Sequence, residues 1–103
     1  MSPIPPLDAA VIGGGPAGLA AAIGIARACR TVALVDCERP GRSDYAQINH
    51  NYLGFPGGVA ATHLRDLGRE QAAHYGIRFE DAEASAVRRV VAGFTIEAPG
   101  MEL

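Results

Sequence analysis

The chain has 103 residues, of which 49% are hydrophobic, 19% are charged and none is Trp, so it has room for one small domain with few large core side chains. Its net charge is −2, and Lys is absent, so that all nine Lys or Arg positions are Arg. This charge gives no positive electrostatic field that would attract nucleic acid or an anionic membrane. Segment 1–6 lacks the basic and apolar regions of a secretory signal, and the apolar run 17–26 is far shorter than the roughly 20 residues that span a bilayer, so we expect a cytoplasmic protein.

The first half of the chain is predicted to form a strand, a helix and a second strand. The apolar run 7–12 is typical of a buried strand, and it ends at a cluster of glycines. A helix follows over about 16–28, since Pro16 suits a first helical turn. Its apolar face comprises Leu19, Ala22, Ile23 and Ala26. The second strand, 31–35, ends at Asp36, and a parallel pair joined by a helix crosses over right-handed in nearly all cases.

A long loop over 37–59 separates this unit from the rest. It is rich in Gly, Pro, Asn and Asp, but its embedded apolar and aromatic side chains argue against disorder. Loops of this length inside compact domains are usually functional when they are ordered, so we expect a functional loop here.

The second half is predicted to begin with a helix over 61–75, started by a capping Thr62 and ended by Gly76. Its inner face comprises Leu64, Leu67 and either Gln71 or Ala72. A third strand over 77–80 and a hairpin of 84–91 with 94–98 follow, and another strand begins at 101.

The glycine cluster satisfies the pattern G-x-G-x-x-G directly after a strand and at the start of a helix, which is the context that this motif requires. Gly13 permits the tight turn, Gly15 lets the backbone approach a pyrophosphate, and Gly18 lets the helix pack closely on the strand. The pyrophosphate would then lie at the positive end of the helix dipole. Asp36 follows at about the expected distance, where its carboxylate can accept hydrogen bonds from ribose hydroxyls and would repel a 2′-phosphate. The alternative is a tight turn alone with a solvated Asp36.

No other pattern in the sequence indicates chemistry. His50, His63 and His74 do not have the spacing of a metal site, and Cys29 and Cys37 form no C-x-x-C motif, so we take both cysteines as free thiols. There is also no Ser-His-Asp arrangement, no nucleophile elbow and no phosphate-binding lysine. We therefore assign neither a metal site nor a catalytic residue.

Two segments together resemble a known family. The run Asp-Ala-Ala-Val-Ile-Gly-Gly-Gly-Pro-Ala-Gly-Leu-Ala-Ala-Ala at 8–22 and the run His-Asn-Tyr-Leu-Gly-Phe-Pro-Gly-Gly at 50–58 resemble the N-terminal FAD segment of thioredoxin reductase-like pyridine nucleotide-disulfide oxidoreductases. The resemblance continues to the end of the chain and corresponds to roughly the first third of such a protein. It implies an α/β class and a Rossmann-like FAD/NAD(P)-binding fold, N-terminal part only, so that residues 1–103 form a single, partial FAD-binding domain.

The resemblance also implies a cofactor and its contacts. FAD would be held in extended form, with NAD(P)H as the electron donor of the whole family but with no site for it in this chain. The positions that match the family's cofactor-binding pattern are Gly13, Gly14, Gly15, Pro16, Ala17 and Gly18 for the pyrophosphate turn, Asp36 for the ribose, Arg42 near a loop Arg, and Asn51 beside the flavin.

The sequence departs from the family pattern in three places. Cys29 replaces the Gly that usually ends the first helix. A left-handed C-cap there would be strained, so we expect that the helix can end in a different geometry. Gly24 lies in the middle of that helix, at a cost of about 0.5–1 kcal/mol relative to Ala. The chain also stops before the family's NADPH domain with its C-x-x-C, which we interpret as a truncation.

Two alternatives stay open at this point. The same glycines and Asp36 would serve an NAD-binding Rossmann unit. A truncated chain without catalysis would act only by association with a partner. Nothing in the sequence supplies a second neighbour for the strand at 7–12, so we expect an exposed apolar edge and, from it, marginal stability or self-association.

Overall fold

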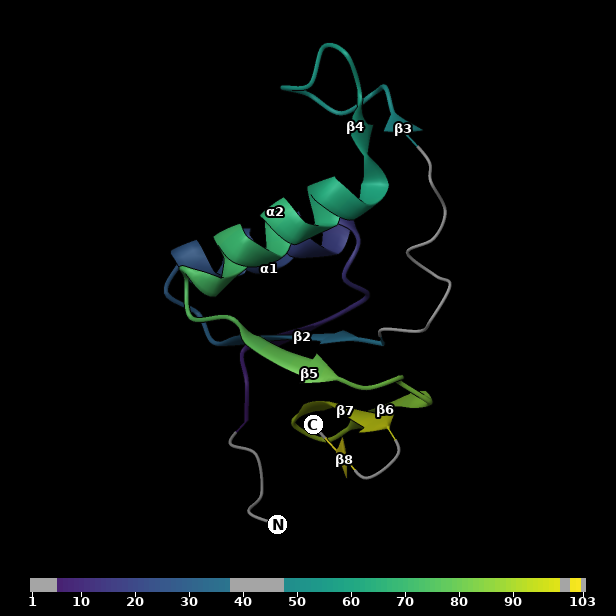
Figure 1. The fold of residues 1–103 in the computed structure, drawn as a ribbon. Coiled ribbons are helices and arrows are strands. Elements are labelled where there is room, and N and C mark those ends of the chain that lie inside the picture. Colours follow the sequence, from purple (N-terminus) through teal and green to yellow (C-terminus); the bar gives the residue numbers. More distant parts are fainter. Residues whose placement is uncertain (1–5, 38–47, 99–100, 103) are drawn as a thin grey trace.

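The computed structural model describes residues 6–37, 48–98 and 101–102 (Figure 1). Within them the elements follow one another in the predicted order, strand, helix, strand, helix, strand and hairpin. Their bounds are β1 Ala9–Ile12, α1 Pro16–Arg27, β2 Val32–Asp36, β3 Ile48–Asn49, β4 Val59–Ala60, α2 Ala61–Ala73, β5 Arg78–Asp81, β6 Ala86–Val90, β7 Gly93–Ala98 and β8 Met101–Glu102.

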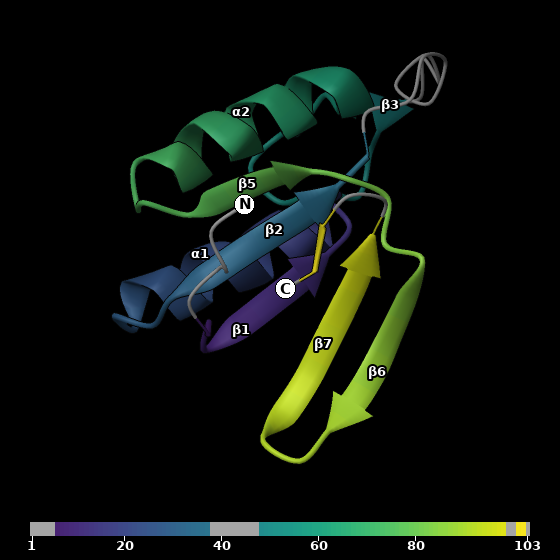
Figure 2. The ribbon, with the colours of Figure 1, turned by 90° about the horizontal axis from the view of Figure 1, so that it is seen from below.

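The chain forms three layers. A parallel sheet of order β1-β2-β5 lies in the middle, with α1 and α2 side by side on one face (Figure 1). An antiparallel sheet of order β6-β7-β8 lies on the opposite side, which Figure 2 shows from below. This arrangement confirms the predicted α/β class and the N-terminal part of a Rossmann-like fold. No helix in the described part of the chain is both long and apolar enough to cross a membrane.

The core lies around β2, which is buried on both faces. Val32 and Leu34 face the helices and pack with Leu19 and Ala22 of α1. Ala33 and Val35 alternate with them, so they face the antiparallel sheet, and both are also buried. The predicted inner face of α1 is therefore confirmed, since Ile23 and Ala26 also pack against this core.

Asp8, just before β1, is joined to Thr31, just before β2, by three hydrogen bonds. The Asp8 carboxylate accepts hydrogen bonds from the Thr31 N–H at 2.8 Å and the Thr31 hydroxyl at 3.1 Å, while the Asp8 N–H donates to Thr31 Oγ1 at 2.9 Å. The backbone hydrogen bond from Thr31, followed by its hydroxyl, lowers the pKa of the Asp8 carboxyl below its usual value of 3.8. These bonds set the register in which β1 pairs with β2.

The first helix ends with Cys29 in the left-handed conformation, at the position where the family pattern has glycine. Cys29 has φ +61°, and its N–H donates to the Ala26 carbonyl at 3.0 Å. The Arg30 N–H donates to the Ile25 carbonyl at 3.3 Å, so the two bonds form a Schellman motif with a non-glycine residue at its left-handed position. The strain is thus present, and the helix does not end differently to avoid it.

Two expectations about α2 are wrong. Thr62 is not its cap, because the helix starts at Ala61 and Ala60 occupies the N-cap position without a side-chain bond. Leu67 is 39% exposed and Gln71 is exposed, so neither forms the inner face. Leu64 and Ala72 are buried there, and Gly68 lies between them, where a Cβ would come within 2.8 Å of Leu19 Cδ1. The close approach of α1 to Gly68 turns Leu67 outward.

The end of α2, the hairpin and the long loop can also be compared with their predictions. The helix α2 ends at Ala73, two residues before the predicted end, and Gly76 follows in the left-handed conformation with φ +70°. The hairpin of β6 and β7 pairs from Ala86 opposite Glu97 to Val90 opposite Gly93. The predicted loop contains a short antiparallel pair, β3 with β4, which the sequence did not indicate.

Candidate functional site

The glycine turn lies between β1 and α1, at the edge of the sheet where the parallel strands end. Figure 1 shows the carboxyl end of β2, the start of α1 and the start of α2 on the same side of the molecule. Gly13 has φ +102°, and its N–H donates to the Val35 carbonyl at 2.8 Å, so the turn leaves β1 while still bonded to β2. The predicted role of Gly13 in a tight turn therefore agrees with its backbone.

The other three glycines of the turn, Gly14, Gly15 and Gly18, each have different surroundings. A Cβ on Gly18 would lie 2.0 Å from the Gly13 carbonyl oxygen, so Gly18 is what allows α1 to pack so closely on the turn. A Cβ on Gly15 would meet nothing within 4 Å, so the backbone here is open to an incoming group. Gly14 is buried, and its Cβ would lie 2.4 Å from Asp36 Oδ2. The motif predicts the roles of Gly15 and Gly18, but it does not predict this close approach of Asp36 to Gly14.

The start of α1 presents unsatisfied N–H groups. The first helical bond runs from the Leu19 N–H to the Gly15 carbonyl at 2.9 Å, and Pro16 has no N–H. The N–H groups of Ala17 and Gly18 thus have no partner within the helix. No acidic side chain lies in the first turn, and the N-cap is a glycine. This end of α1 therefore keeps the positive potential that stabilises a phosphate oxygen.

Asp36 faces the glycine turn from the end of β2. It continues the row of Val32 and Leu34, which face the helices, and its side chain is only 11% exposed. Its Oδ2 accepts hydrogen bonds from Arg65 at 3.2 Å and Arg69 at 3.4 Å, both from α2. The structure thus brings together the predicted turn and the predicted acid, and it adds two arginines to them.

Arg65 and Arg69 were not among the predicted site residues. They lie four positions apart, so they share one side of α2, and that spacing is the only signal the sequence holds. Their partner comes from β2, and the pairing depends on how α2 turns against α1, which no local pattern reveals.

The two predicted loop residues are placed differently. Arg42 lies within 38–47, outside the described residues. Asn51 is exposed in the turn region between β3 and β4, and within the described ranges no hydrogen bond joins it to the glycine turn. The rings of Tyr52 and Phe55 in the same loop lie 6.1 Å apart, centroid to centroid.

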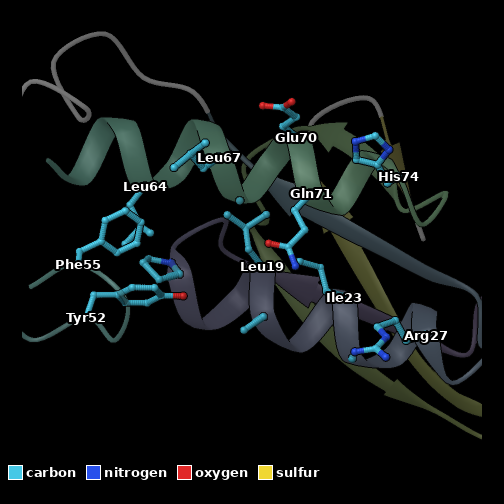
Figure 3. A pocket seen from close by; sticks show the side chains of 14 residues that line it. Leu19, Ile23, Arg27, Tyr52, Phe55, Leu64, Leu67, Glu70, Gln71 and His74 are labelled. Atoms are coloured by element: carbon cyan, nitrogen blue, oxygen red, sulfur yellow. The ribbon is translucent and has the colours of Figure 1, made fainter. Parts of the chain in front are cut away.

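A groove of about 690 Å³ lies between α1 and α2, with loop residues Tyr52 and Phe55 at one end (Figure 3). Pro16 is the one residue of the glycine turn that lines it, and Asp36 does not. The helices contribute Leu19, Ala20, Ile23, Gly24, Arg27, Leu64, Leu67, Gly68, Glu70, Gln71 and His74. The groove is therefore separate from the edge of the sheet at which the turn and Asp36 meet.

No group of three or more His, Cys, Asp or Glu side chains in the described ranges could hold a metal ion. Cys29 and Cys37 are free thiols, as predicted, and His63 and His74 are exposed on or beside α2.

Comparison with known proteins identifies the ligand that this arrangement fits. Residues 8–54 match a family described as the FAD binding domain. The chain is 41% identical over 73 residues to a thioredoxin reductase from Aquifex aeolicus (strain VF5), a match that covers 70% of this chain and 23% of that protein. The chain thus spans about a quarter of the length of this curated relative.

Solved structures extend the similarity to nearly the whole chain. The crystal structure of HlmI is 35% identical with a TM-score of 0.79, and the match covers 94% of this chain and 31% of that one. The atypical thioredoxin reductase TRi from Desulfovibrio vulgaris Hildenborough is 28% identical with a TM-score of 0.80, covering 95% of this chain and 33% of the other. These matches confirm the predicted resemblance to an N-terminal FAD-binding segment of thioredoxin reductase-like flavoproteins, with FAD as the cofactor.

The residues present fit that cofactor. The open face of Gly15, the N–H groups at the start of α1 and the Asp36 carboxylate lie in the order in which FAD offers a pyrophosphate and an adenosine ribose. The same geometry would also serve NAD, so it is the match to the FAD binding domain and to thioredoxin reductases that favours FAD over a plain NAD-binding unit and over a chain that acts only by association.

Proposed function

We propose that this chain binds the ADP half of FAD, with the pyrophosphate against the turn 13–18 and the adenosine ribose at Asp36. The contact between Gly14 and Asp36 is the observation that carries the proposal, since it brings the pyrophosphate turn and the ribose acceptor within one ligand's reach.

Each part of the site has a distinct task in this proposal. The N–H groups of Ala17 and Gly18 donate to phosphate oxygens, and the dipole of α1 favours the negative charge. Asp36 accepts hydrogen bonds from ribose hydroxyls and so fixes the orientation of the nucleotide. When bound, FAD supplies the hydride and electron transfer, and the protein supplies position and electrostatics.

The activity of a complete protein is a further step of the proposal. We infer an NAD(P)H-dependent oxidoreductase similar to thioredoxin reductase, in which residues 1–103 form part of the FAD-binding domain. The similarity of the described fold to an atypical thioredoxin reductase supports this, while the chain spans about a third of that protein and about a quarter of the curated thioredoxin reductase. Arg42 and Asn51 remain proposed cofactor contacts, and a cytoplasmic location remains a prediction that cell fractionation would check.

The test of FAD binding uses a substitution at Gly15. Because Gly15 has φ −74° and open space beside it, Gly15→Leu should leave the fold intact while its side chain blocks the pyrophosphate. We expect FAD-dependent fluorescence quenching with the wild-type chain, weaker quenching with NADH, and loss of at least tenfold in FAD affinity in the variant.

The matched control is Gly24→Leu, which adds the same side chain to open space further along α1. It should bind FAD like the wild type. Absence of FAD binding by the wild-type chain, or unchanged affinity in Gly15→Leu, would contradict the proposal.

We also infer self-association through β1. In the parallel sheet β1 has β2 as a neighbour on one side and no described strand on the other. Ala10 and Ile12 of β1 are exposed, which leaves an apolar strand edge available for pairing with a second copy. A sedimentation coefficient that rises with protein concentration would support this, and a constant monomeric value would exclude it.

A further inference from the structure

Arg65 and Arg69 converge on a single oxygen of the proposed ribose acceptor. Both guanidinium groups donate to Asp36 Oδ2, at 3.2 Å and 3.4 Å. The arginines lie one helical turn apart on α2, whereas Asp36 lies at the end of β2, so the contact ties the second helix to the edge of the sheet. All three side chains are less than a third exposed, so solvent screens this cluster less than a surface ion pair.

The shared contact leaves the two carboxylate oxygens in different states. Oδ2 is held by the arginines and lies against Gly14, where no side chain could fit. Within the described ranges, no residue donates a hydrogen bond to Oδ1. Since a carboxylate accepts through both oxygens, Oδ1 remains available to a hydroxyl group of a ligand. The side chain is thus fixed by one oxygen and available through the other.

The arginines are themselves held in place. The Arg69 guanidinium lies 5.6 Å from the centroid of the Phe79 ring, and Phe79 pairs in register with Leu34 on β2. This cation–π contact orients the guanidinium above the sheet.

We propose that Arg65 and Arg69 are positioning residues that hold Asp36 so that the site selects nucleotides with intact ribose hydroxyls. This inference rests on the proposed binding of the ADP half of FAD. The arginines touch the carboxylate and act on the ligand through it, so their removal should reduce discrimination between ribose and deoxyribose more than it changes the fold.

The experiment measures ADP, 2′-deoxy-ADP and 3′-deoxy-ADP binding to the full chain by calorimetry. A hydroxyl that donates to a charged acceptor should make the wild type prefer ADP over at least one deoxy analogue by about tenfold or more. In Arg65→Gln, Arg69→Gln and the double variant, the preference should fall to within about twofold. In an Asp36→Ala background, the arginine substitutions should cause no further loss of preference, because their effect passes through Asp36.

The control is Arg88→Gln, which removes an equal charge from a pair with Glu97 on the hairpin, where Arg88 is 67% exposed. It should keep the wild-type preference. If both arginine variants keep that preference as well, the inference is wrong while FAD binding stands. If the wild type binds neither FAD nor ADP, both proposals fail. Circular dichroism melting identifies any variant that unfolds, and Arg65→Gln alone decides the question should the double variant do so.

Discussion

The backbone of Cys29 stores strain at the end of α1. A side chain at φ +61° crowds the following carbonyl, and glycine avoids that contact. We predict that Cys29→Gly raises the free energy of unfolding by about 1 kcal/mol, since the Schellman bonds would form without the clash. The midpoint of urea unfolding would measure this.

A matched variant separates strain from thiol chemistry. Cys29→Ser removes the sulfur but keeps the Cβ, so it should leave the midpoint close to that of the wild type. An equal gain in both variants would show that the thiol, and not the backbone, limits stability.

Asp8 makes the stability depend on acid. Its pKa is lowered in the folded state by the hydrogen bonds from Thr31, so its contribution is fully present above the unfolded value and is lost as the pH falls through the lowered folded value. Asp8→Asn should therefore flatten the fall in stability between about pH 5 and pH 2. Thermal melting at a series of pH values would test this, and an unchanged slope would refute it.

Single residues also show what the sequence could and could not reveal about the site. The roles of Gly13, Gly15 and Gly18 were predictable because the motif has a fixed position between strand and helix. The contacts of Arg65 and Arg69 were not, because they join α2 to a strand 29 and 33 residues earlier. Only the packing of one helix on another sets that distance.

The first helix carries two glycines with opposite consequences. Gly24 is exposed, and an added Cβ would meet nothing within 4 Å, so Gly24→Ala should stabilise the protein by about 0.5–1 kcal/mol through helix propensity alone. Gly18→Ala should instead destabilise it by roughly 1–3 kcal/mol, because its Cβ would meet the Gly13 carbonyl at 2.0 Å. Thermal unfolding of the two variants side by side would check the signs, and the same sign for both would contradict the packing described here.

Helices and strands were predictable where the apolar residues followed a single clear spacing. The strand, helix and strand of the first unit have bounds within two residues of the prediction, because their apolar spacing and glycine boundaries agree. The inner face of α2 was predictable only in part: Leu64 and the alternative Ala72 are confirmed, but Leu67 and Gln71 fit a helical stripe equally well and are exposed. The close approach of Leu19 to Gly68 decided between the two stripes, and that is a contact between helices.

At the scale of the whole molecule, we predict that the edge of β1 controls association between copies. The N–H groups of Ala9 and Gly13 bond to β2, so those of the alternate residues Ala10 and Ile12 face the side on which the described part of the chain places no strand. Lysine on such an edge opposes pairing with another chain. Ala10→Lys should therefore shift sedimentation toward the monomer and make the unfolding midpoint independent of protein concentration.

The control for this change is Ala21→Lys, which adds the same charge at an exposed position of α1. It should sediment like the wild type. A wild-type chain that is monomeric at all concentrations, with a sharp unfolding transition, would count against association through β1.

The parts of the proposed nucleotide site lie at different places along the chain. They therefore leave the ribosome at different times, which sets the order in which we expect the site to assemble. The glycine turn and Asp36 need only β1, α1 and β2, which form contacts local in sequence and therefore fast to close. Arg65 and Arg69 leave the ribosome later, with α2. On the proposed assignment of the site, we expect the growing chain to present the pyrophosphate turn before the arginines of α2 can orient Asp36, so that affinity for the cofactor arises first and selectivity for its ribose second.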